Sequence, residues 1–236
     1  MDINKPNLNV PASKLPVEEE VHDFRTSFHW RVFRIMAEFV DGWQFLADFK
    51  KTVTFFGSAR FTEDNHWYQV ARELGNMLVK EKYGVVTGGG PGIMEAGNRG
   101  ALEGKGSSIS FNIRLPSYDQ RENPYVNKRL GFHYFFIRKV MLSYSAQAYV
   151  FFPGGYGTLD EVFEIITLIQ TKKISVKIPV VLIGKEFWNP LMDWMKDQVY
   201  GKYQAIDKED MDIYTIVDTA LEAMKIIRKA PERKEL

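Results

Sequence analysis

The sequence predicts an α/β fold built on a parallel sheet with helices on both faces. Two observations lead to this prediction. From residue 52 onward, short apolar runs alternate with amphipathic segments, and glycine-rich loops follow several of the apolar runs. Strands that alternate with helices imply right-handed crossovers, which make neighbouring strands parallel and cover both faces of the sheet. The chain has 236 residues, of which 45% are hydrophobic, so it can bury a substantial core.

The first 50 residues are predicted to form an N-terminal extension, and residues 51–236 the α/β domain. Residues 1–16 contain three prolines and little apolar periodicity, so we expect an extended tail there. Pro16 precedes a valine and three glutamates, and acidic residues are favourable in the first turn of a helix. A long amphipathic helix is therefore predicted over residues 17–49.

Aromatic and aliphatic side chains fall on more than one face of this predicted helix. Phe24, Phe28 and Val32 form one stripe at helical spacing, whereas Trp30 and Phe33 lie off that stripe. A helix that packs only on its own domain needs one apolar stripe, and exposed apolar patches usually mark partner contacts. We therefore expect a homo-oligomer, at least a dimer, with packing on its own domain as the alternative role for the helix.

Within the domain, apolar runs and helical periodicity predict the elements in order. Strands are expected at residues 52–57, 84–87, 107–113, 148–152, 179–183 and, as a short last strand, 213–217. Helices are expected at residues 64–82, 93–103, 134–145, 158–171, 187–199 and 219–229. Residues 114–131 are polar and contain two prolines, so they are predicted to form a long connection.

Glycine-rich or polar loops follow three of the predicted strands. Their sequences are GSAR at 57–60, TGGGPG at 87–92 and PGGYGT at 153–158. Ligands of doubly wound sheets bind beyond the carboxyl ends of the strands. Two of the loops lead directly into helices, and the N–H groups of a helix N-terminus attract phosphate. The pattern predicts a nucleotide or sugar phosphate, but it lacks both the third glycine of a dinucleotide fingerprint and the G-K-[ST] of a Walker A loop.

Composition excludes several other functions. The formal net charge is +1, which argues against nucleic acid as a partner. The chain has no cysteine, and its four histidines show no metal-ligand spacing, so we expect no metal and no disulfide. No apolar stretch approaches the ~20 residues that a membrane span needs, and the N-terminus has no apolar signal segment. A cytoplasmic protein is therefore expected.

Three segments together resemble the LONELY GUY (LOG) family. They are PGGYGTLDE at 153–161, FIRK at 136–139 and GGGPGIMEAGNRGA at 88–101, and the family signature P-G-G-x-G-T-x-x-E is met without a mismatch. The family consists of cytokinin riboside 5′-monophosphate phosphoribohydrolases that are often mislabelled lysine decarboxylases. The resemblance covers roughly residues 52–229. The segment at 111–125 and the N-terminal extension are similar to the longer bacterial branch.

The resemblance implies a Rossmann-like fold, no cofactor, a dimer or hexamer, and a set of site residues. Arg138 and Glu161 are the implied catalytic residues. The implied substrate-binding residues are Ser58, Gly88, Gly89, Gly90, Met94, Asn98, Glu122, Lys139, Gly154, Gly155, Tyr156, Gly157, Thr158 and Thr167. Among these, Gly155, Gly157 and Thr158 would hold the 5′-phosphate, and Glu122 is the candidate for the family's binding glutamate in the connection after the third strand.

These residue types suit cleavage of an N-glycosidic bond in AMP or N6-prenyl-AMP. A carboxylate such as Glu161 can stabilise the oxocarbenium-like sugar. Arg138 stays protonated, so its expected role is positioning and charge stabilisation rather than proton donation. A non-catalytic carrier of a nucleotide or the molybdenum cofactor is the alternative, although a carrier need not keep both residues. A lysine decarboxylase normally uses a lysine-bound pyridoxal phosphate, and no such sequence context is visible.

Overall fold

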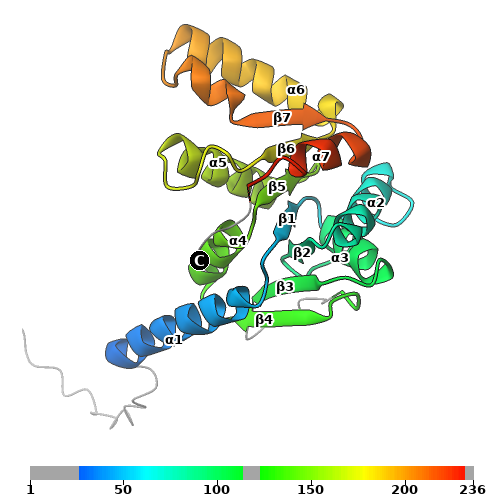
Figure 1. Ribbon diagram of the computed structural model, residues 1–236. Coiled ribbons are helices and arrows are strands. Elements are labelled where there is room, and N and C mark those ends of the chain that lie inside the picture. Colours follow the sequence, from blue (N-terminus) through cyan, green and yellow to red (C-terminus); the bar gives the residue numbers. More distant parts are fainter. Residues whose placement is uncertain (1–26, 114–122, 232–236) are drawn as a thin grey trace, which may run out of the picture.

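The computed structural model describes residues 27–113 and 123–231, which form a doubly wound α/β fold (Figure 1). Its seven-stranded sheet has the order β4-β3-β2-β1-β5-β6-β7, and every neighbouring pair is parallel. The strands are β1 (Thr52–Phe56), β2 (Gly84–Thr87), β3 (Ser108–Ile113), β4 (Lys128–Phe132), β5 (Ala148–Phe151), β6 (Val180–Ile183) and β7 (Tyr214–Val217). The fold class predicted from the sequence is confirmed.

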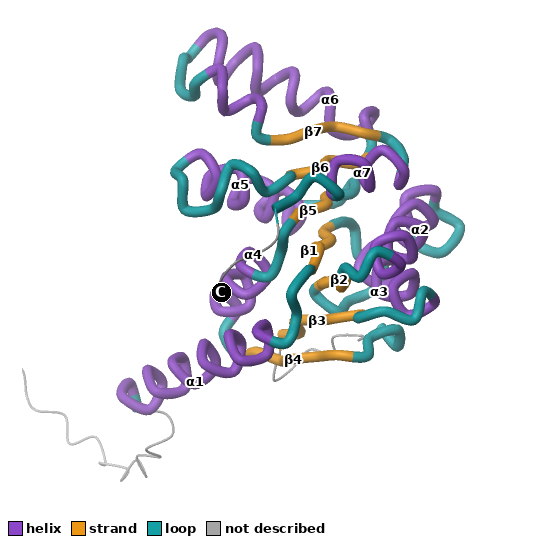
Figure 2. The backbone as a smooth tube through the Cα atoms, viewed as in Figure 1, coloured by secondary structure: helices purple, strands orange, loops and turns teal. Residues whose placement is uncertain are grey.

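Helices cover both faces of this sheet (Figure 2). The α-helices are α1 (Phe28–Ala47), α2 (His66–Lys80), α3 (Ile93–Glu103), α4 (Phe135–Tyr144), α5 (Tyr156–Gln170), α6 (Lys185–Trp194) and α7 (Ala220–Ile227). A π-helical segment, Met195–Lys202, follows α6 directly, and a short 3-10 helix spans Lys208–Asp212. Among the described residues, no helix is both long and apolar enough to cross a membrane.

The core has two layers, one on each face of the sheet. One layer packs α2, α3 and α7 on the sheet, and the other packs α1, α4, α5 and α6 on the opposite face. Adjacent strand residues alternate between the layers, as Phe55 and Phe56 of β1 and Val85 and Val86 of β2 do. Because both faces are covered, the strands are apolar along their length, which explains why they are easy to find in the sequence.

The six strands predicted from the sequence agree with the structure to within one residue at each end. The seventh strand, β4, corrects the prediction that residues 114–131 form only a connection. It pairs with β3 alone, at the edge of the sheet, and its first residues Lys128 and Arg129 are exposed. Charged residues are common on edge strands, where they oppose edge-to-edge association, and here they conceal the apolar pattern.

The N-terminal helix also differs from its prediction. Ser27 is extended and accepts a hydrogen bond from the Trp30 amide, so α1 begins at Phe28, whereas residues 1–26 lie outside the described part of the chain. The stripe of Phe28 and Val32 does not face the core, because these side chains are 72% and 38% exposed. The buried face carries Glu38, Gly42 and Leu46 instead.

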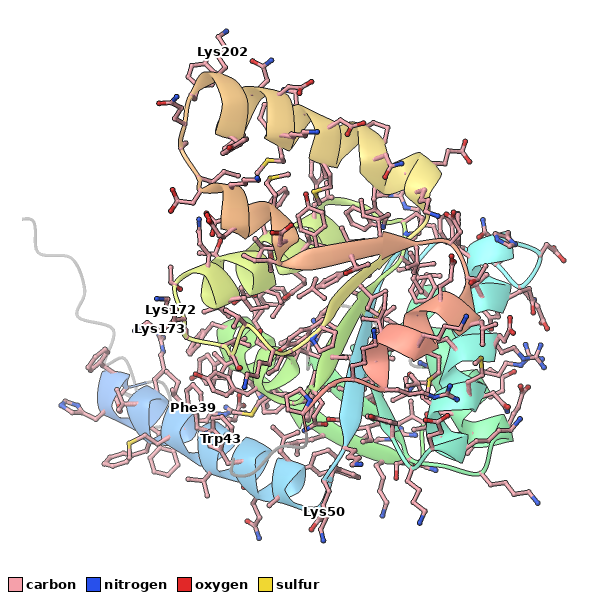
Figure 3. All side chains as sticks on the ribbon, turned by 45° about the horizontal axis from the view of Figure 1, so that its top comes forward. Phe39, Trp43, Lys50, Lys172, Lys173 and Lys202 are labelled. Atoms are coloured by element: carbon pink, nitrogen blue, oxygen red, sulfur yellow. The ribbon has the colours of Figure 1, made fainter. Side chains whose placement is uncertain are left out.

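The second half of α1 packs on the domain. Phe39 and Trp43, labelled in Figure 3, lie partly buried against the core layer that includes α4 and α5. The alternative role given to this helix, packing on its own domain, is therefore confirmed for its second half. The division of the chain at residue 50 stays a prediction.

Candidate functional site

A cavity of about 830 Å³ lies at the carboxyl ends of the central strands. Strands β1 and β5 are neighbours in the sheet, and the chain winds away from them in opposite directions, which makes this the topological switch point. The loop after β1 and the loop after β5 both line the cavity, and the Ser58 amide donates to the Pro153 carbonyl oxygen at 3.0 Å. The cavity therefore occupies the position where doubly wound folds bind ligands.

The N-terminus of α5 forms one wall of the cavity. The N-cap is Gly155, which has no side chain that could cap the first N–H groups of the helix. A Cβ added at Gly155 or Gly157 would meet no described atom within 4 Å, whereas one at Gly154 would lie 2.1 Å from Thr158 Oγ1. Unpaired N–H groups beside open space and a positive helix end are suited to an anion such as phosphate.

The glycine loop after β2 approaches this wall closely. A Cβ at Gly88 would lie 2.2 Å from Arg138 Nη2, so only glycine leaves room for the guanidinium. Gly89 has a φ of +74°, a conformation that glycine adopts without strain. Of the loop glycines predicted to bind substrate, Gly88 lines the cavity, and Gly89 and Gly90 lie behind it.

Asn98 supports this loop from beneath and does not line the cavity. Its side chain is fully buried, accepts from Thr87 Oγ1 at 2.6 Å and donates to Ser108 Oγ at 2.9 Å. Asn123 completes the support, because its backbone amide donates to Gly89 O and its side-chain amide to Gly90 O, both at 3.0 Å. In this structure Asn98 fixes the glycine loop, and the expectation that it contacts substrate stays a prediction.

Arg138 reaches the cavity from the first turn of α4. Its Nε donates to Phe111 O at 2.8 Å, and an Nη2 contact to Gly88 O measures 3.4 Å. Burial lowers the pKa of the guanidinium, and the charge of Glu161 acts in the opposite direction. The two carbonyl contacts fix the guanidinium plane at the ends of β3 and β2.

Glu161 lies in the second turn of α5 and is buried in the same cavity. Its Oε2 has no hydrogen-bond partner among the described residues. Burial raises the pKa of this carboxyl to about 8; Lys139 opposes the shift, and Glu164 and Asp160 add to it. Burial therefore favours the neutral form of Glu161.

Lys139 and Thr167 are not among the residues that line the cavity, and their implied roles in substrate binding stay predictions. Lys139 Nζ lies 2.6 Å from Asp160 Oδ2 and 3.2 Å from Glu164 Oε2, so it bridges α4 and α5. Thr167 is exposed further along α5. Glu122 falls outside the described residues.

The cavity does bring together most of the other predicted site residues. They are Ser58, Gly88, Met94, Arg138, Gly154, Gly155, Tyr156, Gly157, Thr158 and Glu161. Sequence reasoning missed Arg60, Phe61, Phe135, Leu142 and Phe187 as lining residues. Phe187 follows β6 closely, so the rule that sites lie beyond strand ends could have found it.

Within residues 27–113 and 123–231, no group of three or more histidine, aspartate or glutamate side chains could hold a metal ion. The cavity instead combines a helix N-terminus, a buried arginine and a glutamate whose pKa is raised by burial. These features define a doubly wound α/β protein with a cavity suited to an anion at its switch point.

The family model described as possible lysine decarboxylase matches residues 94–227, more than half of the chain. The chain therefore belongs to this family, which includes the LONELY GUY enzymes. The resemblance carried by the PGGYGTLDE segment is confirmed.

Several relatives have names that state an activity, among them a rice and a bacterial protein. The chain is 28% identical over 194 residues to cytokinin riboside 5′-monophosphate phosphoribohydrolase LOG of Oryza sativa, covering 80% of this chain and 71% of that protein. It is 29% identical over 140 residues to pyrimidine/purine nucleotide 5′-monophosphate nucleosidase of Escherichia coli K12, covering 56% of this chain and 30% of that protein. Both names specify nucleoside 5′-monophosphates as substrates.

Solved structures share the fold. The X-ray structure of TM1055 aligns with a TM-score of 0.57 at 25% identity, covering 76% of this chain and 99% of that one. The molybdenum cofactor carrier protein of Chlamydomonas reinhardtii gives a TM-score of 0.57 at 20% identity, covering 77% and 98% of the two chains. At that identity, the likeness to the carrier concerns the fold alone.

Proposed function

We propose that this protein hydrolyses the N-glycosidic bond of nucleoside 5′-monophosphates and releases the free base and ribose 5-phosphate. The observation that carries the proposal is the meeting of Arg138 and Glu161 in one cavity beside the N-terminus of α5. The names of the rice and Escherichia coli relatives support the same substrate class.

The 5′-phosphate is assigned to the N-terminus of α5. Gly155 and Gly157 leave open space there, so phosphate oxygens can approach the backbone N–H groups. Thr158 Oγ1 lies in the same cavity wall and can donate a further hydrogen bond. With the phosphate in this position, the ribose extends toward Glu161, which lies one helical turn beyond Thr158.

Glu161 enters the reaction as the neutral acid. As the bond between the base nitrogen and ribose C1′ breaks, its electron pair goes to the base, and the Glu161 proton goes with it. The carboxylate left behind faces the positive charge on the sugar and stabilises it. Water then adds to C1′ and returns a proton to Glu161, so the enzyme is restored.

Arg138 keeps its charge throughout because a guanidinium does not release its proton in this range. Its bonds to Phe111 O and Gly88 O hold it in one orientation beside Glu161. We assign it to orienting the substrate and to stabilising the carboxylate that forms on Glu161 when the base departs.

The base is assigned to the aromatic side chains of Phe135 and Phe187, which line the same cavity. These side chains are exposed by 55% and 38%, so they can stack on a ligand. Such side chains suit an adenine and can accept an apolar substituent on its N6 atom. The proposed substrates are therefore AMP and N6-prenyl-AMP.

A carrier protein is the second candidate, because molybdenum cofactor carriers share the fold. Product analysis separates the two candidates. The protein is incubated with AMP, N6-isopentenyl-AMP and the two corresponding nucleosides, and free base is measured by chromatography. We expect base from the monophosphates and far less from the nucleosides. Binding without base release would favour a carrier, and equal rates with and without the phosphate would refute the assignment of α5.

Variants of the catalytic residues complete the test. E161Q and R138A should bind nucleotide and release base far more slowly than the unaltered protein. E73Q is the matched control, because Glu73 is exposed on α2, on the opposite face of the sheet. A normal rate in E161Q would contradict the proposed proton transfer.

A further inference from the structure

The start of α4 is held by a carboxylate from α1. Glu38 is 9% exposed, and its Oε1 accepts a hydrogen bond from the His133 backbone amide at 2.9 Å. Its Oε2 accepts from the Tyr134 backbone amide at 3.3 Å. His133 Nδ1 lies 3.4 Å from the same Oε1, and Arg34 contacts the other ring nitrogen. A buried acid of the N-terminal extension is therefore bound to the turn that precedes α4.

Helix α4 has no cap from its own sequence within the described chain. Tyr134 is the N-cap residue, its side chain makes no cap hydrogen bond, and the first turn contains no acidic residue. Helix N-termini carry unpaired N–H groups and a partial positive charge, which a nearby carboxylate stabilises. Glu38 supplies that negative charge from a different helix.

The contact between the two helices continues beyond this point. A Cβ at Gly42 would lie 2.6 Å from Met141 Sδ, so the backbone of α1 comes very close to α4 there. The rings of Trp43 and Tyr144 pack edge to face, with centroids 5.2 Å apart. Because contacts occur at the beginning and the end of α4, α1 fixes this helix along its length.

Arg138 lies one turn beyond the residues that Glu38 binds. The Arg138 amide donates to the Tyr134 carbonyl oxygen at 3.3 Å, which joins the two positions within the first turn. Moving the start of α4 therefore moves the point from which the Arg138 side chain extends. Its contacts with Phe111 O and Gly88 O depend on that point.

We propose that Glu38 is a positioning residue for Arg138, and that α1 contributes to the function of the site in this way. Glu38 binds the start of α4 and is not among the residues that line the cavity, so it acts through the placement of α4. This inference rests on the proposed function, because Arg138 is assigned its role there.

The test compares E38A and E38Q with the unaltered protein, using AMP as substrate. A displacement of about 1 Å in a catalytic group can lower a rate by about a hundredfold, so we expect kcat of E38A to fall by roughly ten- to a hundredfold. KM should hardly change, because the phosphate contacts come from α5. E38Q keeps one carbonyl acceptor and should lose less activity.

The matched control is D41A, because Asp41 is an exposed acid on the same helix. Thermal unfolding shows which variants remain folded at the assay temperature, and E38Q serves if E38A does not fold. A double-mutant cycle with R138K then separates positioning from general destabilisation. If Glu38 acts through Arg138, E38A should cost much less activity in the R138K protein than in the unaltered one.

Each outcome has a definite meaning. Equal losses in both backgrounds, or full activity in E38A and E38Q, would overturn the positioning role and leave the proposed function intact. An unaltered protein that releases no base would overturn the proposed function first, and this inference with it. Amide hydrogen exchange in α4 gives a readout without substrate: it should be faster in E38A than in D41A, and equal exchange would again overturn the inference.

Discussion

At the scale of single residues, the protonation of Glu161 has a consequence for stability. Burial raises the pKa of this carboxyl from 4.5 to about 8 in the folded protein, so folding opposes its ionisation. The unfolded chain therefore loses this proton at lower pH than the folded protein does. The free energy of unfolding falls as pH rises from 4.5 to about 8, and above this range the lost stability stays constant.

We predict that E161Q is more stable than the unaltered protein at pH 8, and that the difference shrinks as the pH is lowered toward 4.5. Glutamine fills the same space and has no charge to bury. Denaturant unfolding at several pH values measures the difference. A stability gain that instead grew on acidification would mean that Glu161 is ionised in the folded protein.

Two neighbouring glycines should respond differently to a methyl group. A Cβ at Gly154 would collide with Thr158 Oγ1, whereas one at Gly155 meets open space in the cavity. We therefore expect G154A to lower the melting temperature, and G155A to leave it unchanged but weaken nucleotide binding. Loss of one charge-assisted hydrogen bond to phosphate corresponds to about a tenfold weaker affinity. Calorimetric titration with AMP and thermal unfolding check the two expectations, and unaltered binding by G155A would count against the phosphate position.

The residue scale is also where sequence reasoning reached its limit. The motif predicted Arg138 and Glu161, and the structure brings both to one cavity. The same motif segments contain Lys139, which joins α4 to α5 through ion pairs, and Asn98, which is buried and supports the glycine loop. A linear motif specifies which residues lie close to a site, but the direction in which each side chain leaves its helix decides which of them enter the site.

At the scale of elements, α4 and α5 meet through Lys139, whose charge acts on Glu161. Lys139 lowers the pKa of Glu161, partly offsetting the effect of burial. We predict that K139Q raises this pKa further, so that activity persists to higher pH than in the unaltered protein. The pH dependence of kcat measures the shift, with K225Q as control because Lys225 is exposed on α7. An alkaline limb that stayed in place, or moved to lower pH, would disprove the coupling.

Elements differ in how well the sequence predicts them, for a physical reason. Central strands such as β1 and β5 are buried on both faces, so they are apolar throughout and easy to recognise. The edge strand β4 has one neighbour and exposed charges, and α1 presents only part of its apolar surface to the core. Periodicity alone does not reveal which apolar face of α1 is inside.

At the scale of the whole molecule, α1 leaves apolar side chains uncovered. Phe28, Phe33, Met36 and Val40 are exposed by 72%, 63%, 57% and 62%. A patch of this kind is typical of a protein interface, and two-fold association of identical chains is the commonest arrangement. The expected homo-oligomer stays a prediction, with this face of α1 as the expected contact.

We predict that F33E converts the oligomer to a monomer, because a charge would be buried in the interface. Light scattering at micromolar concentration measures the mass. L221E is the control, since Leu221 is a similarly exposed apolar residue on α7. A monodisperse monomer for the unaltered protein would contradict the oligomer, and an F33E protein of unchanged mass would place the contact elsewhere.

The hydrogen bond between Ser58 and Pro153 joins two loops of the cavity at the switch point, and it also constrains when the site can form. Strand β1 lies beside β5, although three other strands and their helices separate the two in the chain. Contacts between residues so distant in sequence form slowly, because much of the intervening chain must be ordered first. During synthesis, the loop after β1 therefore cannot form its hydrogen bond to the loop after β5 until that second loop has emerged from the ribosome. The site should consequently be among the last parts of this protein to become native.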